Sequence, residues 1–283
     1  MKKMLRSLLT MSTLITITLS SCSDDDSVQQ PVDPSDVNAL SSVLIIPGNK
    51  RSGDLPVSSN DPNAPNIGNN QTSASVVADN TLFLPFNFFT ASGAGSGYGG
   101  CYIQVDGASD FWDIPASSIT TDDIGLLVIP VQIPDFILNG DFSLSYAIYD
   151  NNNRVSNMLT TSVVIESIQT CPGTDSGSDG LTILSYDLGD SSGIVPIRYN
   201  MYSLRDRMDV FYNDQWVGGT GSSLGVNDFP PVSQCGDGTD GYVSGSGTVE
   251  LNYDPGISRI LTLYMSGCIG SSTAWDLRVG CPD

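Results

Sequence analysis

Acidic side chains are the residues of this chain that could do acid–base chemistry, because the sequence contains no histidine. That absence excludes a Ser-His-Asp triad, a Cys-His pair and the usual His-bearing zinc sites. A glycosidase needs only two carboxylates, but no pair stands out. Asp206 and Asp209 lie close together, yet Arg205 and Arg207 adjoin them, and surface ion pairing explains the group. We therefore expect a protein that is not an enzyme.

Two stretches rich in Asp and Gly have the composition of cation-binding loops. Residues 175–180 (DSGSDG) resemble the opening of a calcium loop, with Asp175 and Asp179 at alternating positions. An EF-hand needs an acidic twelfth residue, and Asp187 comes one position late. Residues 235–241 (CGDGTDG) are similar in composition. Calcium held by these three aspartates is one expectation, ordinary turns are the alternative, and no other cofactor is expected.

Aromatic residues next to polar turns are the candidates for ligand binding, since β-sandwich modules hold sugars by stacking them on exposed rings. Trp216 follows a predicted turn and has Tyr212, Asn213 and Asp214 as neighbours. These four residues form the first candidate site, and Tyr98, on a Gly-rich loop, is the second. Packing in the core is the alternative for Trp216.

The cysteines indicate an oxidising compartment. Apart from Cys22 the chain has an odd number of them, which allows at most two disulfides and one free thiol: Cys101, Cys171, Cys235, Cys268 and Cys281. Cys268 and Cys281 lie on consecutive predicted strands, so we expect them to pair. Cys171 with Cys235 is the second predicted bridge.

A short apolar segment near the start of the chain stops at a cysteine. Basic residues precede it, and residues 8–19 are too few for a transmembrane helix, which takes about 20 apolar residues. Residues 19–22 (LSSC) resemble the lipobox of bacterial lipoproteins. In that family the Cys carries acyl chains such as palmitate and begins the mature protein. The resemblance implies a signal peptide over residues 1–21 and lipidation of Cys22. An ordinary secretory signal with an incidental Cys is the alternative.

An acidic stretch follows the cysteine. Residues 23–26 (SDDD) are similar to the acidic export tag that follows the lipidated Cys in surface lipoproteins of Bacteroidota. This resemblance implies a lipid-anchored outer-membrane protein exposed at the cell surface. A spacer in a lipoprotein that faces the periplasm is the alternative. Residues 22–40 have little to bury and predict a solvated, lipidated tether.

The overall composition excludes one class of partner and favours one fold class. The chain has 31 acidic and 11 basic residues and a net charge of −20, whereas nucleic-acid binding needs clustered cations. Helix-favouring residues are scarce, and Gly, Ser, Thr, Asn and Val are abundant, which is typical of a β-protein with many turns.

Short apolar segments predict a first sandwich over residues 41–168. The first strand is expected at 42–47 and a long loop at 48–72. Residues 142–149 alternate apolar and small or polar side chains, as in a half-buried strand. Seven or so strands in this span favour a β-sandwich of immunoglobulin-like type, although no Cys…Trp…Cys signature accompanies them.

A linker is predicted at residues 169–180, followed by a second strand set at 181–283. Its last strand alternates Trp275, Leu277 and Val279 with polar residues, so we expect the tryptophan in the core. The set looks like the jelly-roll modules of secreted bacterial proteins, including carbohydrate-binding ones. The fold class is therefore all-β, with two sandwich domains.

These observations leave two function classes. The first is a non-catalytic, membrane-anchored surface lipoprotein that binds a glycan or adheres to a protein ligand. The alternative is a structural or accessory subunit of an outer-membrane assembly.

Overall fold

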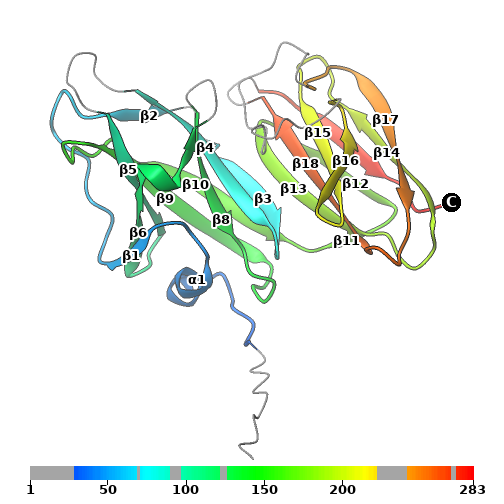
Figure 1. Cartoon of the computed structure of the whole chain (residues 1–283), viewed down its shortest axis with the longest axis horizontal. Coiled ribbons are helices and arrows are strands. Elements are labelled where there is room, and N and C mark those ends of the chain that lie inside the picture. The colour runs from blue at the N-terminus through cyan, green and yellow to red at the C-terminus, as the bar shows by residue number, and fades with distance from the viewer. Residues whose placement is uncertain (1–28, 69–70, 90–96, 122–125, 222–240, 269–271) are drawn as a thin grey trace, which may run out of the picture. The chain divides into compact units, whose positions relative to one another are not determined.

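The computed structural model describes residues 29–68, 71–89, 97–121, 126–221, 241–268 and 272–283. The chain divides into two units, residues 1–30 and residues 31–283. The first lies almost wholly outside the described residues, and so do the predicted signal, Cys22 and the acidic tag. The second holds all the strands and helices that the structure describes (Figure 1). Strands dominate it, so the all-β prediction is confirmed.

Two sheets form the first sandwich. One has the order β2-β4-β8-β7, and its strands are β2 (Asn66–Gly68), β4 (Thr81–Phe89), β8 (Leu126–Gln132) and β7 (Thr120–Thr121). The other begins β1-β6-β5-β9-β10-β3, and its strands are β1 (Asn49–Ser52), β6 (Asp110–Pro115), β5 (Tyr98–Val105), β9 (Gly140–Asp150), β10 (Leu159–Glu166) and β3 (Ser73–Val77). A 3-10 turn, η1 (Ala116–Ser118), follows β6.

This strand order is that of an immunoglobulin domain. When β2, β4, β5, β7, β8, β9 and β10 are lettered A to G in chain order, one sheet is A-B-E-D and the other contains G-F-C. Strand β6 extends the second sheet in the position of C′, and β3 pairs with β10 in parallel. The immunoglobulin-like prediction for the first half is confirmed.

Two further sheets form the second sandwich. One has the order β12-β19-β14-β17, with β12 (Gly173–Gly177), β19 (Trp275–Val279), β14 (Gly193–Asn200) and β17 (Ser246–Tyr253). The other has the order β13-β18-β15-β16, with β13 (Gly180–Asp187), β18 (Ile260–Gly267), β15 (Arg207–Tyr212) and β16 (Gln215–Gly219). A short strand, β11 (Gln169–Thr170), pairs in parallel with β13.

The connectivity of the second sandwich is that of a jelly roll. When its eight antiparallel strands β12 to β19 are numbered one to eight, the sheets have the orders 1-8-3-6 and 2-7-4-5. This is the double Greek key of a jelly roll, in which each strand of one sheet is followed mainly by a strand of the other. The second architectural prediction is confirmed as well.

Each sandwich encloses a cluster of buried apolar residues. The first contains Leu84, Phe86 and Tyr146, and the second contains Trp275 and Leu263, all at most 1% exposed. Burying side chains of this size stabilises the fold by about 1.5–3 kcal/mol each. Trp112 also lies in the first core.

The long sheet continues from one sandwich into the other. Strand β13 meets β3 at one parallel residue pair, Thr182 and Ser75. Beside it, the Gln71 side-chain amide donates to the Leu181 carbonyl at 2.7 Å. Leu181 and Ile183 of β13 belong to the first core cluster, although their strand forms part of the jelly roll.

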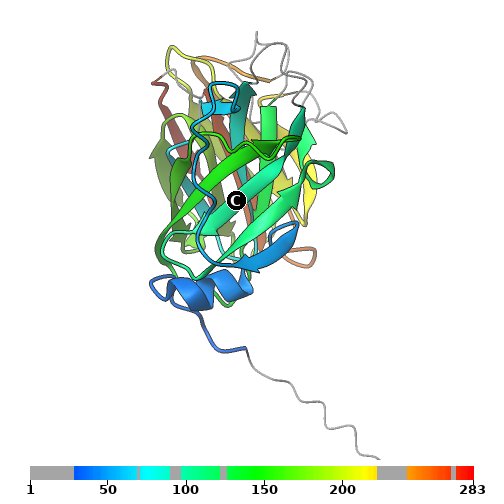
Figure 2. The ribbon, with the colours of Figure 1, turned by 90° about the vertical axis from the view of Figure 1, so that its left-hand side faces the viewer.

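The predicted tether is too long at its C-terminal end. Val32 exchanges backbone hydrogen bonds with Phe136 and Leu138, and Leu40 is fully buried in the first core. The helix α1 (Val37–Val43) carries Leu40 and lies at one end of the immunoglobulin-like strands (Figure 2). The sequence 31–40 is polar on average, but these few apolar residues are enough to fix it to the fold.

Three local predictions are wrong. Residues 42–47 were expected to form a strand, but α1 takes up the beginning of that segment, and Ile45 makes only an isolated bridge to Gln132. The expected loop 48–72 contains β1 and β2. Both strands lie at sheet edges, where pairing needs little apolar periodicity. The predicted linker 169–180 likewise carries β11 and β12.

Both predicted disulfide pairings are wrong. Cys171 bonds to Cys281, with their Cα atoms 5.0 Å apart, so neither Cys268–Cys281 nor Cys171–Cys235 can form. The register explains the observed bond: β12, which follows Cys171, pairs antiparallel with β19, which precedes Cys281. Cys268 is disulfide-bonded too. Cys101 is a free, buried cysteine, and burial raises the pKa of its thiol.

Candidate functional site

A depression lies on the outer face of the jelly-roll sheet β12-β19-β14-β17. It has a volume of about 610 Å³ and is lined by Thr174, Asp175, Ser176, Arg198, Tyr199, Asn200, Asp276, Leu277 and Arg278. The strand pleat explains its polar character. On β19, Trp275 and Leu277 point into the core, so Asp276 and Arg278 point outward.

The sheet register brings outward-facing side chains of three strands together. Arg198 of β14 stands directly opposite Arg278 of β19, and Asn200 stands opposite Asp276. On the other side of β19, Thr174 of β12 is opposite Arg278, and β12 also places Ser176 opposite Asp276. These paired positions therefore bring together two cations, one carboxylate, one amide and two hydroxyl groups, and a second carboxylate, Asp175, also lines the depression.

The two arginines differ from five other basic side chains of the fold. Arg51, Arg154, Arg207 and Arg259 each form an ion pair with at least one aspartate, and so does Lys50. Within the part of the chain that the structure describes, no acidic side chain forms an ion pair with Arg198 or Arg278. Like charges directly opposite on paired strands destabilise a sheet. This surface thus holds two adjacent positive charges without an ion-pair partner among the described residues, although two carboxylates, Asp175 and Asp276, line the same depression.

Tyr202 stands beside the depression and contacts its carboxylate. The residue has a left-handed backbone, with φ of +46°, and its N–H donates to the Asn200 side chain at 3.1 Å. Its hydroxyl donates to Asp276, and this hydrogen bond raises the pKa of Tyr202. The side chain is 48% exposed, so part of its ring remains open to a ligand.

The carboxylate of Asp175, the first predicted calcium ligand, is hydrogen-bonded to neighbouring side chains. Its Oδ2 accepts from the Gln169 side-chain amide at 2.7 Å and from the Tyr186 hydroxyl. Burial, and then the hydrogen bond to Asp175, raise the pKa of Tyr186. Asp179 is exposed and also has an interaction of its own.

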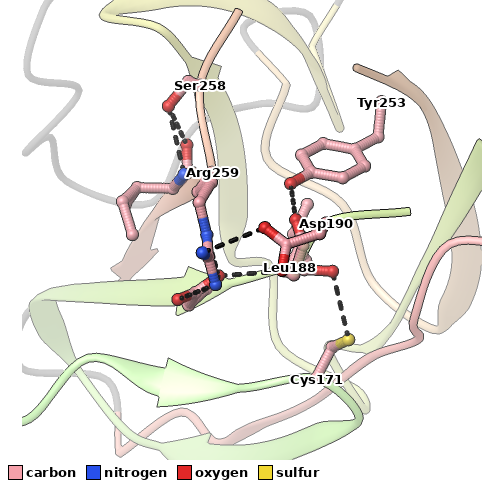
Figure 3. A network of polar contacts seen from close by, with 9 residues as sticks. Cys171, Leu188, Asp190, Tyr253, Ser258 and Arg259 are labelled. Atoms are coloured by element: carbon pink, nitrogen blue, oxygen red, sulfur yellow. Dashed lines mark hydrogen bonds and ion pairs between the residues drawn. The ribbon is translucent and has the colours of Figure 1, made fainter. Parts of the chain in front are cut away.

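Asp187, the third predicted calcium ligand, belongs to a different network. Arg259 contacts its carboxylate through two nitrogens at 2.9–3.2 Å and also pairs with Asp190 (Figure 3). The Gly189 N–H, and Arg259 after it, lower the pKa of Asp187. In the described residues no three Asp, Glu, His or Cys side chains gather in a way that could hold a metal ion. Calcium binding stays a prediction.

The predicted aromatic site around Trp216 is only partly open. Asn213 and Asp214 form an exposed hairpin turn with φ of +52° and +56°, as the sequence suggested. Trp216 is half-buried on β16, and its indole N–H donates to Asp209 at 3.0 Å. Tyr212 is buried, and its hydroxyl donates to the carbonyls of Asp254 and Ser258.

The ion pair predicted for this region is buried, not at the surface. Arg207 contacts Asp209 through two nitrogens at 2.8 and 3.0 Å, and the two residues are 3% and 0% exposed. Burial raises the pKa of Asp209, and Arg207 and Trp216 oppose that rise. Asp206 is a separate buried carboxylate that accepts from Thr273 and from the Cys268 N–H. These aspartates hold the fold together around β15.

Tyr98, the second predicted aromatic candidate, packs inward. Its ring lies 5.5 Å from that of Phe88, and its buried hydroxyl has no hydrogen-bond partner among the described residues. Burial raises its pKa. Tyr102 and Tyr149, whose rings stack at 4.6 Å, are nearby aromatic residues that are partly exposed.

Of the residues that line the depression, only Asp175 was a candidate from the sequence, as a calcium ligand. The alternation in residues 275–279 already placed Asp276 and Arg278 outside the core, and the same pattern in β14 exposes Arg198. What it could not show is that β14 pairs with β19 in the register that brings these side chains together.

The fold defines the class of this protein as a tandem of an immunoglobulin-like sandwich and a jelly roll, with a polar depression on the jelly roll. No helix in the described part of the chain is long and apolar enough to span a bilayer. No family model matches the sequence, and no curated protein matches it either.

Several solved structures are similar to parts of this chain. Fibronectin(III)-like modules of CbhA from Clostridium thermocellum share 12% identity over 36% of this chain and 97% of theirs, with a TM-score of 0.25. Murine CRIg shares 6% identity over 37% of this chain and 98% of its own, with a TM-score of 0.24. SGBP-B of the Bacteroides ovatus mixed-linkage glucan utilization locus, in complex with a mixed-linkage heptasaccharide, shares 8% identity over 73% of this chain and 51% of its own, with a TM-score of 0.20. These scores are too low to support an argument about function.

Proposed function

We propose that this protein is a non-catalytic lipoprotein of the outer membrane that is displayed at the cell surface and binds a glycan in the depression on the jelly roll. The acylated thiol of Cys22 is its anchor, and residues 23–30 link that anchor to the folded unit, which begins at Pro31.

One observation carries the binding function. The depression presents hydroxyl, amide, carboxylate and guanidinium groups to solvent on a rigid sheet, with the Tyr202 ring beside them. A glycan offers hydroxyl groups that both donate and accept hydrogen bonds, together with apolar ring faces that pack on aromatic side chains. Groups held on strands need little reordering when a ligand binds.

The same surface supports a binding role over a catalytic one. The two carboxylates that line the depression, Asp175 and Asp276, each accept a hydrogen bond from a tyrosine hydroxyl. General acid–base catalysis needs a group whose pKa lies near the operating pH, and the sequence has no histidine to supply one.

Anchoring is tested by mass spectrometry of the protein purified from membranes. The expected N-terminal residue is an acylated Cys22, and Cys22→Ala should release the protein from the membrane fraction. Protease treatment of intact cells should cleave the wild-type protein if it faces outward. Protection from protease in intact cells but not in lysed cells would place it in the periplasm.

Ligand binding is tested with the full chain in detergent on a glycan array. We expect Tyr202→Ala and Asn200→Ala to reduce binding, because both changes remove groups at the depression. Trp216→Ala is the control on the other sheet of the same sandwich. Loss of binding only in the Trp216 variant would move the site to the predicted aromatic cluster. Absence of any glycan, with one stoichiometric partner retained from native membranes, would support an accessory subunit instead.

A further inference from the structure

The charged side chains of the depression on the jelly roll narrow the class of glycan that it can bind. We infer that it binds an acidic glycan, by placing one oxyanion of the sugar, a carboxylate or a sulfate, between Arg198 and Arg278. This inference rests on the proposed glycan-binding function and specifies its ligand.

The two arginines of the depression have no ion-pair partner among the described residues, although the protein has a large excess of acid. The chain has 31 acidic residues for 11 basic ones, and five other basic side chains of the fold have found aspartate partners. Arg198 and Arg278 have no such ion pair among the described residues, although both are exposed. A folded chain that pairs its cations elsewhere leaves these two available for an external anion.

The cross-strand placement of the two arginines also suits a single anionic group. The two arginines are cross-strand partners on β14 and β19 and point to the same face of the sheet. Side chains in such positions have their Cβ atoms about 4.5–5.5 Å apart. Both guanidinium groups can therefore reach one carboxylate or sulfate, and arginine binds these groups through paired, charge-assisted hydrogen bonds. A bound oxyanion would also remove the repulsion between the two cations.

The charged groups of the depression are few and lie among groups that can hydrogen-bond to sugar hydroxyls. Thr174 and Ser176 line one side of β19, Asn200 lines the other, and Asp276 lies between them as an acceptor. A nucleic acid would need several clustered cations, and the net charge of −20 repels densely charged polymers. A sugar with one oxyanion and several hydroxyls matches the depression in both charge and hydrogen bonding.

The test is isothermal titration of the full chain in detergent with matched trisaccharides. The probes are trigalacturonic acid, a sulfated galactotriose and neutral galactotriose. We expect one of the charged probes to bind more tightly than the neutral one, and binding to weaken as salt increases. Arg198→Gln and Arg278→Gln should each weaken binding of the charged probe about tenfold or more, the usual loss for a hydrogen bond to a charged group. Arg51→Gln, which removes an exposed arginine from the other sandwich, should leave it unchanged.

The outcomes separate this inference from the proposed function. If neutral galactotriose binds as tightly as the charged probes, or if both depression variants bind the charged probe like wild type, the acidic-ligand inference is wrong while glycan binding stands. If a glutamate tripeptide binds as tightly as the charged sugars, the site recognises anions without sugar specificity and the inference also fails. If no glycan of any charge binds here or on the array, the proposed function itself fails.

Discussion

At the scale of single residues, we expect the stability of the fold to depend most strongly on the buried Arg207–Asp209 ion pair of β15. Asp209→Asn would keep the size of the side chain but leave the Arg207 cation, 3% exposed, without its compensating carboxylate. We expect the free energy of unfolding to fall by about 3–5 kcal/mol. Urea denaturation followed by fluorescence measures this loss, and Trp216, which also contacts Asp209, is a local reporter.

The matched control lies on the adjoining hairpin turn. Asp214→Asn removes a charge from an exposed position with a left-handed backbone, which asparagine tolerates, so stability should not change measurably. Equal effects of the two substitutions would show that the Arg207–Asp209 pair contributes nothing beyond general charge balance.

A second residue-scale prediction concerns pH and the turn after β9. Burial acts to raise the pKa of Asp150, but the N–H groups of Arg154 and Asn152 and the Arg154 guanidinium outweigh it, so the net shift is downward. A carboxyl whose folded pKa lies below its unfolded value of 3.8 stabilises the fold above that pH. The contribution disappears as the pH falls through the folded pKa.

This shift is measured by urea denaturation at pH 6 and pH 3. Wild type should lose more free energy of unfolding between the two than Asp150→Asn, which cannot titrate at that position. Parallel losses in the two proteins would mean that Asp150 does not contribute to acid sensitivity.

At the scale of elements, close packing of an aromatic ring on a strand depends on a glycine in β5. A Cβ atom at Gly100 would overlap the Tyr149 ring and the Ile114 carbonyl, both on neighbouring strands. We expect Gly100→Ala to destabilise the protein by about 1–3 kcal/mol, the usual cost of overpacking. Thermal unfolding checks this. Gly68→Ala on β2 is the control, since the nearest atom to its Cβ would be a Phe89 ring carbon at 3.9 Å; a similar loss there would refute the steric explanation.

Elements were predictable from the sequence where local periodicity determines them. The alternation of Trp275, Leu277 and Val279 gave both the existence of β19 and its inward face, and the Asn213-Asp214 turn was also visible. Helix α1 and the edge strands β1 and β2 were missed, because tertiary contacts such as the burial of Leu40 outweigh weak local propensity.

Pairings between distant strands were not predictable in this way. Local patterns give the direction in which a side chain points, but register depends on which strands meet. That is why the Arg198–Arg278 pair and the Cys171–Cys281 disulfide were both missed, although each follows directly from the partners of β19.

At the scale of the whole molecule, two cores meet in one continuous sheet, so their stabilities should be linked. Leu181 belongs to a jelly-roll strand but is fully buried in the immunoglobulin-like core. The neighbouring hydrogen bond from the Gln71 side chain to the Leu181 carbonyl also links the two sandwiches. Loss of the jelly roll would therefore expose apolar surface of the first core.

The Cys171–Cys281 disulfide is the means to test that linkage. It closes a loop across a sequence separation of 110 residues, and a loop of that length corresponds to about 4–5 kcal/mol of stabilisation in the chain-entropy account. Cys171→Ser/Cys281→Ser should lower the melting temperature of the jelly roll, as calorimetry measures it. Because Leu181 and Ile183 are shared, calorimetry should show the immunoglobulin-like half melting at a lower temperature as well. A jelly-roll transition that moves alone, with the first-half transition unchanged, would show that the single Thr182–Ser75 bridge does not couple the two cores.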